Sequence, residues 1–157
     1  MKKIIMALIF VTTGLLGFAM HGKNATVQLA KCSVNLPGDL EDGIDFFHGT
    51  WKEALKKSDK EDKLIFLDAY ASWCGPCKLM SRNTFTDSRV GSFFNANFIN
   101  YKMDMEKHPE GPRLSKKYAL KAYPTLYFVD ENENVVLTTL GYQDAKQLIA
   151  FGQKALK

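Results

Sequence analysis

The sequence is poor in cysteine and histidine, with three residues of each in a chain of 157. Three cysteines are too few for a disulfide framework, and a chain of this length does not need one, because it buries about two-thirds of its unfolded surface. A structural zinc site would need two further ligands beside a Cys-x-x-Cys pair. Cys32, His21, His48 and His108 show no second paired spacing, so we expect no metal. The cysteines therefore have a role other than scaffolding.

An excess of charge of one sign is also missing. The chain has 21 basic and 17 acidic residues, a formal net charge of +4, and 46% of its residues are apolar. The charge is too small for a protein whose main role is to bind nucleic acid, and the apolar content is too high for a disordered chain. We expect one globular domain and no nucleic-acid partner.

Long apolar runs are absent except near the N-terminus. Two lysines follow the first methionine, residues 4–20 carry no charge, and the small residues Gly17 and Ala19 stand where a signal peptidase requires them. This pattern predicts a signal peptide at residues 1–19. An uncleaved anchor and a lipoprotein acylated at Cys32 remain alternatives. In each case the rest of the chain would work outside the cytoplasm, in the periplasm of a bacterium with two membranes.

Helical and strand patterns alternate after an N-terminal extension at residues 20–45. Residues 44–47 could form a short strand, and residues 64–67 have the continuous apolar character of a strand buried on both faces. Further strands are expected at residues 98–103, 125–129 and 135–140, and helices at residues 51–58, 76–85, 112–118 and after Asp144. The alternation predicts an α/β domain at residues 46–157.

The chemistry-bearing motif is Trp73-Cys74-Gly75-Pro76-Cys77, at the point where a buried strand is followed by a helix. Free backbone N–H groups and the partial positive charge of a helix N-terminus favour a thiolate at the first cysteine. Cys74, on the solvent side of the turn, would be the attacking nucleophile, and the more buried Cys77 would resolve the mixed disulfide. Gly75 permits a tight turn, and Pro76 suits the first helical turn.

The segment at residues 64–78 closely resembles the active-site segment of thioredoxin. The likeness continues at residues 101–104, which resemble the central strand of that family, at residues 122–126, which resemble its cis-proline loop, and at Gly141, which resembles the glycine after its last strand. It extends over residues 46–156. The resemblance implies the thioredoxin fold, a central mixed β-sheet flanked by helices.

The resemblance also implies residue roles. Asp68 matches the buried aspartate that takes the proton from the second cysteine, Lys102 matches its lysine partner, and Pro124 matches the cis-proline that faces the sulfurs. A solvent-facing aspartate at a strand end is the alternative for Asp68. Substrate contact is implied for the residues around the cysteines, namely Trp73, Gly75, Pro76, Tyr123, Pro124 and Gly141.

Three features depart from the thioredoxin pattern. Tyr70 stands where the family often has tryptophan, and Cys32 in the extension has no assigned role. Residues 84–88 look more like the periplasmic thioredoxin-like domain of transmembrane thiol-disulfide interchange proteins. This last similarity leaves the identity of the partner open.

Together these features predict a thiol-disulfide oxidoreductase that reduces disulfides of exported proteins through Cys74 and Cys77 and needs no cofactor. The Gly75-Pro76 dipeptide resembles the reducing members of the family. A reductant outside the cytoplasm implies a membrane electron donor, and the family usually works as monomers. A periplasmic disulfide oxidase or exchange catalyst is one alternative, and a thioredoxin-fold binding module without required redox activity is the other.

Overall fold

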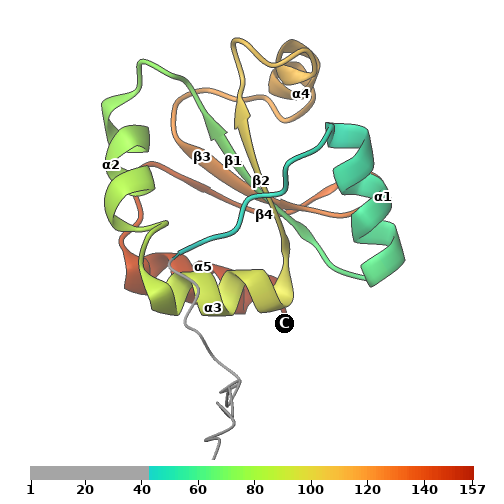
Figure 1. Ribbon diagram of the computed structural model, residues 1–157. Helices are drawn as coiled ribbons and strands as arrows, with labels where there is room; N and C mark the ends of the chain where they lie inside the picture. Colours follow the sequence, from blue (N-terminus) through green and yellow to red (C-terminus); the bar gives the residue numbers. More distant parts are fainter. Residues whose placement is uncertain (1–42) are drawn as a thin grey trace, which may run out of the picture. The chain divides into compact units, whose positions relative to one another are not determined.

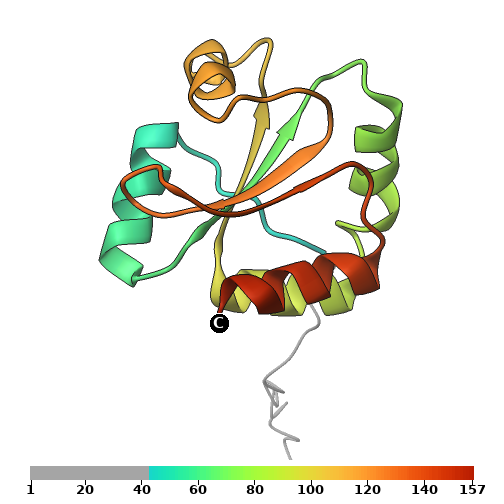
Figure 2. The same ribbon diagram turned by 180° about the vertical axis from the view of Figure 1, so that it is seen from behind.

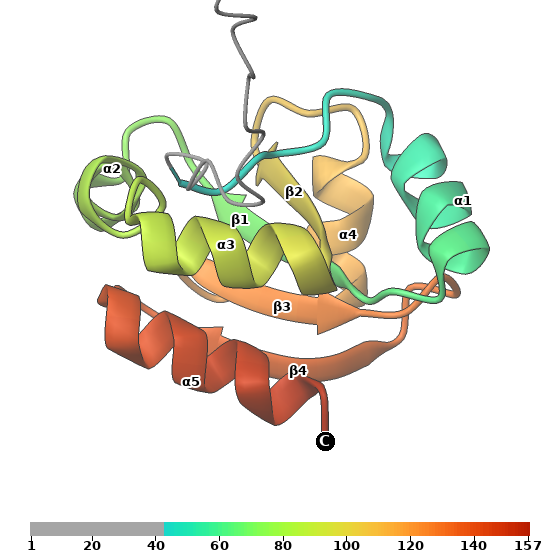
Figure 3. The same cartoon turned by 60° about the horizontal axis from the view of Figure 1, so that its bottom comes forward.

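The computed structural model describes residues 43–157, so the expected leader, nearly all of the N-terminal extension and Cys32 lie outside the described residues. Within residues 43–157, one four-stranded sheet has the order β2-β1-β3-β4. The strands are β1 (Ile65–Tyr70), β2 (Ile99–Asp104), β3 (Thr125–Val129) and β4 (Val135–Leu140). Strand β1 runs parallel to β2 and antiparallel to β3, and β4 pairs with β3 as an antiparallel hairpin (Figure 3).

Five helices in the same part of the chain flank this sheet (Figure 1). They are α1 (Trp51–Glu61), α2 (Gly75–Asn83), α3 (Ser88–Asn97), α4 (Gly111–Lys117) and α5 (Ala145–Ala155). In residues 43–157 none of the helices combines the length and the apolar character that crossing a membrane requires.

Strand β1 contributes to two cores because successive side chains point to opposite faces of the sheet. Ile65, Leu67 and Ala69 pack in the core under α1 and α4, whereas Phe66 packs in the core under α2, α3 and α5. Helices α3 and α5 lie side by side, as the opposite views in Figures 1 and 2 show. The alternation places Asp68 on the same face as Phe66, toward α2.

The β-hairpin has the predicted bounds, and the other predicted elements, except the strand at residues 44–47, lie within three residues of their predicted bounds. The sequence analysis did not predict α3. Asp87 caps this helix by accepting a hydrogen bond from the backbone N–H of Arg89 (2.9 Å). Glycine and asparagine weaken its intrinsic helix propensity. Phe94 compensates by packing edge-to-face on Phe66, with ring centroids 4.7 Å apart. Tertiary packing therefore stabilises a helix that the local pattern does not specify.

The predicted strand at residues 44–47 is wrong. This segment is extended but carries no regular ladder. The N–H of Ile44 donates to the carbonyl of Phe85 (2.7 Å), and the N–H of Phe47 donates to the carbonyl of Asn100 (2.8 Å). Between them, the N–H of Asp45 donates to a side-chain oxygen on α3 (2.9 Å). The segment follows the outer edge of β2 without pairing with it residue by residue.

A charged cluster fastens the β-hairpin to two helices. Glu133, whose side chain is 13% exposed, accepts hydrogen bonds from the indole of Trp51 (2.7 Å), from both terminal nitrogens of Arg113 (2.6 and 2.8 Å) and from Lys117 (2.8 Å). These bonds, above all those of Arg113, lower the pKa of Glu133 to about 2. One carboxylate thus connects α1, α4 and the turn between β3 and β4.

We expect Glu133→Gln to lower the free energy of unfolding by about 1–3 kcal/mol at pH 7, the range for lost hydrogen bonds between charged groups. Because the folded-state pKa lies below the ordinary value of 4.5, the contribution of this group is present above pH 4.5 and is lost as the pH falls toward 2. Denaturant unfolding of parent and variant at pH 7 and pH 3 measures the difference. Glu131→Gln, in the same exposed turn, is the control and should change stability little. Equal losses for both variants would contradict the role of the cluster.

Candidate active site

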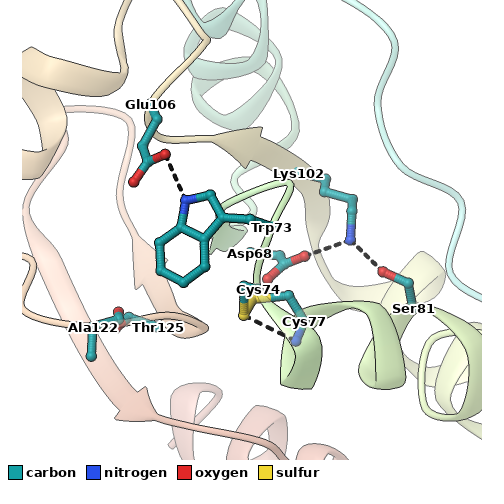
Figure 4. Close-up of a disulfide and its surroundings, with 9 residues drawn as sticks. All are labelled: Asp68, Trp73, Cys74, Cys77, Ser81, Lys102, Glu106, Ala122 and Thr125. Atoms are coloured by element: carbon teal, nitrogen blue, oxygen red, sulfur yellow. Dashed lines mark hydrogen bonds and ion pairs between the residues drawn. A yellow bond between two sulfur atoms is a disulfide. The ribbon is translucent and has the colours of Figure 1, made fainter.

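A disulfide between Cys74 and Cys77 lies at the junction between β1 and α2 (Figure 4). Cys74 is the N-cap of α2, and its Sγ accepts a hydrogen bond from the backbone N–H of Cys77 (3.2 Å). Gly75 begins the helix, and Pro76 occupies its first turn, where a missing N–H leaves no intrahelical bond unmade. The first sulfur therefore lies at the positive end of a helix dipole, as the sequence predicts.

The two cysteines are equally buried, which corrects the expectation that Cys74 is the more exposed. Each residue is 3% exposed in this oxidised form. Both pack with Ala71, and the rings of Tyr70 and Tyr123 cover this cluster. Position rather than exposure distinguishes the pair, since Cys74 caps the helix and Cys77 lies inside it.

Asp68 lies in the centre of the sheet and is 1% exposed. It is in register with Lys102 on the parallel neighbour β2, and its Oδ2 accepts a hydrogen bond from the ammonium of that residue (2.8 Å). Burial raises the pKa of Asp68 above its ordinary value, and the positive charge of Lys102 opposes this rise. Within residues 43–157 its other oxygen, Oδ1, has no hydrogen-bond partner. The predicted burial of Asp68 and its pairing with Lys102 are confirmed.

The ammonium of Lys102 has a second partner on α2. It donates to the hydroxyl of Ser81 (2.7 Å) and lies over the rings of Tyr70 and Phe85, 4.6 and 4.9 Å from their centroids. Lys102, Ser81, Tyr70 and Cys77 also line a cavity of about 300 Å³. The lysine that pairs with Asp68 is thus held within a small space that reaches the second cysteine.

Pro124 lies in the loop before β3, and the peptide bond between Tyr123 and Pro124 is cis. The carbonyl of Pro124 accepts a hydrogen bond from the N–H of Gly141 (2.8 Å), which follows β4. Gly141 has a φ of +87°, a conformation that side-chain-bearing residues rarely adopt. The hydroxyl of Thr125 bonds to the carbonyl of Ala122 (2.8 Å) and closes the loop. These contacts join the ends of β3 and β4 beside Tyr123, which contacts the cysteine cluster.

Trp73 presents a large apolar ring next to the disulfide and is 66% exposed. Its Nε1–H donates to a carboxylate oxygen of Glu106 (2.8 Å), and its ring meets the edge of Tyr123 with centroids 5.8 Å apart. Both aromatic residues line a cleft of about 510 Å³ together with Ser115 and Leu120. An exposed tryptophan fixed at both ends offers a defined contact surface.

Most of the predicted site residues therefore gather around the disulfide. Two other residues of the site, Ser81 and Glu106, were missed by the sequence analysis. The signal for Ser81 is its spacing of four residues from Cys77, which puts both on one side of α2. The signal for Glu106 is its place just after β2, at the same end of the sheet as the motif. Neither signal stands out without knowledge of which side chains meet.

Metal chemistry has no candidate in the part of the chain that the structure describes. Between residues 43 and 157 there is no group of three or more histidine, cysteine, aspartate or glutamate side chains placed to hold an ion.

A mixed sheet flanked by helices, with a Cys-x-x-Cys disulfide at a helix N-terminus and a cis-proline loop beside it, defines a thioredoxin-like protein. The model of the Thioredox_DsbH family, described as a protein of unknown function, DUF255, matches residues 30–146, and the chain belongs to this family.

Known proteins of two kinds are similar to the chain. Thioredoxin-1 of Drosophila melanogaster is 35% identical over 75 residues, which cover 48% of this chain and 64% of that protein. The thiol:disulfide interchange protein DsbD of Haemophilus ducreyi is 35% identical over 96 residues, which cover 58% of this chain and 16% of that protein. The chain thus spans less than two-thirds of the first of these relatives and about one-sixth of the second.

Among solved structures, the chain is similar to "a putative disulphide-isomerase from Bacteroides thetaiotaomicron". The sequences are 46% identical, the TM-score is 0.65, and the match covers 74% of this chain and 95% of the other. The predicted fold class is therefore confirmed: the domain is a thioredoxin-like domain of the DsbD and DsbH type with a Cys-x-x-Cys pair.

Proposed function

We propose that this protein is a thiol-disulfide oxidoreductase that reduces disulfides of exported proteins through Cys74 and Cys77. The observation that carries the proposal is the placement of the pair at the N-terminus of α2, with the buried Asp68 and its Lys102 on the face of the sheet toward that helix. A structural disulfide has no use for a buried carboxylate whose pKa is raised. A proton acceptor does require such a group.

The reaction begins with the reduced pair. The Cys74 thiolate, stabilised at the helix N-terminus, attacks one sulfur of a substrate disulfide. A bond forms between Cys74 and that sulfur, the substrate S–S bond breaks, and the second substrate sulfur leaves with the electron pair and takes up a proton. The product of this step is a mixed disulfide between protein and substrate.

Cys77 completes the reaction. Its thiol gives a proton to the carboxylate of Asp68, and the resulting thiolate attacks Sγ of Cys74. The disulfide between Cys74 and Cys77 forms, the mixed disulfide breaks, and the remaining substrate sulfur leaves as a thiolate that takes up a proton. The substrate gains two electrons and two protons. The cysteine pair supplies both electrons, and because Cys74 starts as a thiolate, Cys77 gives up one proton and the other comes from solvent.

The substrate surface in this proposal surrounds the disulfide. Trp73 and Tyr123 supply apolar contact, and the loop before Pro124 offers backbone groups to an extended peptide. Gly75, Pro76 and Gly141 carry little side-chain bulk, which allows a substrate backbone to approach. An added Cβ at Gly75 or Gly141 would meet no atom within 4 Å, so this surface is open.

The partners follow from the compartment. Export by the leader at residues 1–19 would bring the domain of residues 46–157 to the periplasm as a monomer. There a reducing pair needs electrons from a membrane donor, because the surroundings keep thiols oxidised. The similarity to DsbD, a thiol:disulfide interchange protein, supports a donor of this kind.

The reduction potential of the pair is the test of direction. Equilibration of the protein against dithiothreitol or glutathione buffers should give about −250 mV or lower, in the range of reducing thioredoxins near −270 mV. A value of about −150 mV or higher would instead identify an oxidant or exchange catalyst. A potential in the reducing range without reduction of any protein disulfide would favour a binding module.

A further inference from the structure

We propose that Ser81 is a positioning residue that holds the ammonium of Lys102 against Asp68 and thereby sets the pH range in which Asp68 accepts the proton of Cys77. The inference rests on the proposed function and assigns a role to a side chain that the motif does not include. Its basis is one hydrogen bond, 2.7 Å long, between Lys102 Nζ and Ser81 Oγ (Figure 4).

The helix and the sheet bring these groups together by their regular geometry. Residues four apart lie on the same side of a helix, so Ser81 lies one turn beyond Cys77 on the same side of α2. Asp68 and Lys102 are paired in register on neighbouring parallel strands. The hydroxyl and the carboxylate therefore approach one ammonium from two different elements, and Figure 4 shows Lys102 between them.

Lys102 needs both partners to stay in place. Its side chain is 26% exposed and lies beside a cavity of about 300 Å³. The rings of Tyr70 and Phe85 attract the charge but do not direct its hydrogens at particular acceptors. Ser81 Oγ accepts one hydrogen and leaves another directed at Asp68 Oδ2. Without that hydroxyl, the flexible lysine can turn toward water in the cavity and away from the carboxylate.

Other charged and titratable groups face the same space. Lys78 and Arg82 on α2 line the cavity, and Tyr70 on β1 lies beside Lys102. Burial raises the pKa of Tyr70, and the negative charges of Asp104, at the end of β2, and of Asp68 raise it further. These groups are unchanged when Ser81 is replaced, so a shift in the titration of Asp68 reports the position of Lys102.

The direction of the effect follows from charge. The ammonium opposes the rise in the pKa of Asp68 that burial causes. An ammonium that turns away from Asp68 opposes it less, so the protonated carboxyl becomes stable to a higher pH. Asp68 is then a poorer proton acceptor at neutral pH, and the attack of Cys77 slows.

The experiment compares Ser81→Ala, Ser81→Thr and the parent in the full chain. The carboxyl carbon of Asp68 is followed by NMR as a function of pH in the oxidised protein, and insulin disulfide reduction is measured from pH 6 to pH 9.5. Ser81→Ala should raise the titration midpoint of Asp68 and the acid limb of the rate profile by roughly one pH unit, the equivalent of one hydrogen bond to a charged group. Ser81→Thr keeps the hydroxyl and should restore both.

Folding is not expected to limit the comparison, because alanine has a higher helix propensity than serine. Ser92→Ala, at an exposed position of α3, is the matched control and should leave both curves unchanged. An unchanged or lowered midpoint in Ser81→Ala would overturn the positioning role. If Ser81→Ala raised the midpoint of Asp68 while the parent reduced no disulfide, the positioning role would stand and the proposed function would fail.

Discussion

Replacement of Cys74 by serine should abolish insulin disulfide reduction. A hydroxyl at this position cannot form the mixed disulfide, and Cys77, the other thiol of the pair, lies inside α2 and not at its N-cap. We expect a rate indistinguishable from that of dithiothreitol alone. The measurement is the turbidity of precipitating insulin chains with time.

Cys32→Ser makes the same chemical change outside the motif and is the matched control. It should retain the parent rate, because the proposed reaction uses only Cys74 and Cys77. Loss of activity in Cys32→Ser, or residual turnover in Cys74→Ser, would contradict the assignment of the nucleophile.

Cys77→Ser should have a different consequence, namely a stable mixed disulfide. Cys74 can still attack a substrate, but no second thiol releases it. Incubation with oxidised exported proteins, followed by non-reducing electrophoresis, should reveal adducts that disappear with dithiothreitol. Cys74→Ser/Cys77→Ser should yield none. If Cys77→Ser formed no adducts while the parent turned over insulin, the two-step mechanism would be wrong.

Sequence patterns predict β1 and β3 well because these two strands are almost wholly buried and appear in the sequence as apolar runs. The hairpin of β3 and β4 follows from a turn rich in polar residues between two apolar runs, and its bounds agree with the prediction. The buried Asp68 is predictable because it interrupts a continuous apolar run, and its pairing with Lys102 follows from the resemblance to thioredoxin. These features are local or carried by a motif.

Features that depend on packing between distant segments escape such patterns. Gly91 permits α3 to approach the backbone at Gly43, where an added Cβ would lie 2.1 Å from a carbonyl oxygen. In the sequence this glycine weakens the helical pattern instead of explaining it. Ser81 likewise has no distinguishing local context, and its role emerges only when Lys102 is placed beside it.

Asp68→Asn should slow the reaction by about 10²-fold at neutral pH, the low end of what a positioned proton acceptor contributes. The amide cannot take a proton from Cys77. At pH 9.5 a larger fraction of this thiol ionises without help, so the difference from the parent should shrink. Asp59→Asn, at an exposed position of α1, is the control and should follow the parent at every pH.

The same variant tests the burial of Asp68 through stability. Because the folded-state pKa is raised, the contribution of this group is fully present below its unfolded pKa and is lost as the pH rises through its folded pKa. Asparagine does not ionise, so the free energy of unfolding of Asp68→Asn should increase relative to that of the parent as the pH rises from 4 toward 8. This pH dependence is opposite in sign to that of Glu133, whose pKa is lowered and whose contribution to stability is lost as the pH falls.

The two measurements on Asp68→Asn separate a chemical role from a structural one. A carboxylate that only pairs with Lys102 would give the pH-dependent stability difference but equal rate losses at pH 7 and pH 9.5. A proton acceptor gives both the stability difference and a rate defect that recovers at high pH. Equal rate losses would therefore remove Asp68 from the proton transfer and leave Cys77 to ionise through solvent in the adjoining cavity.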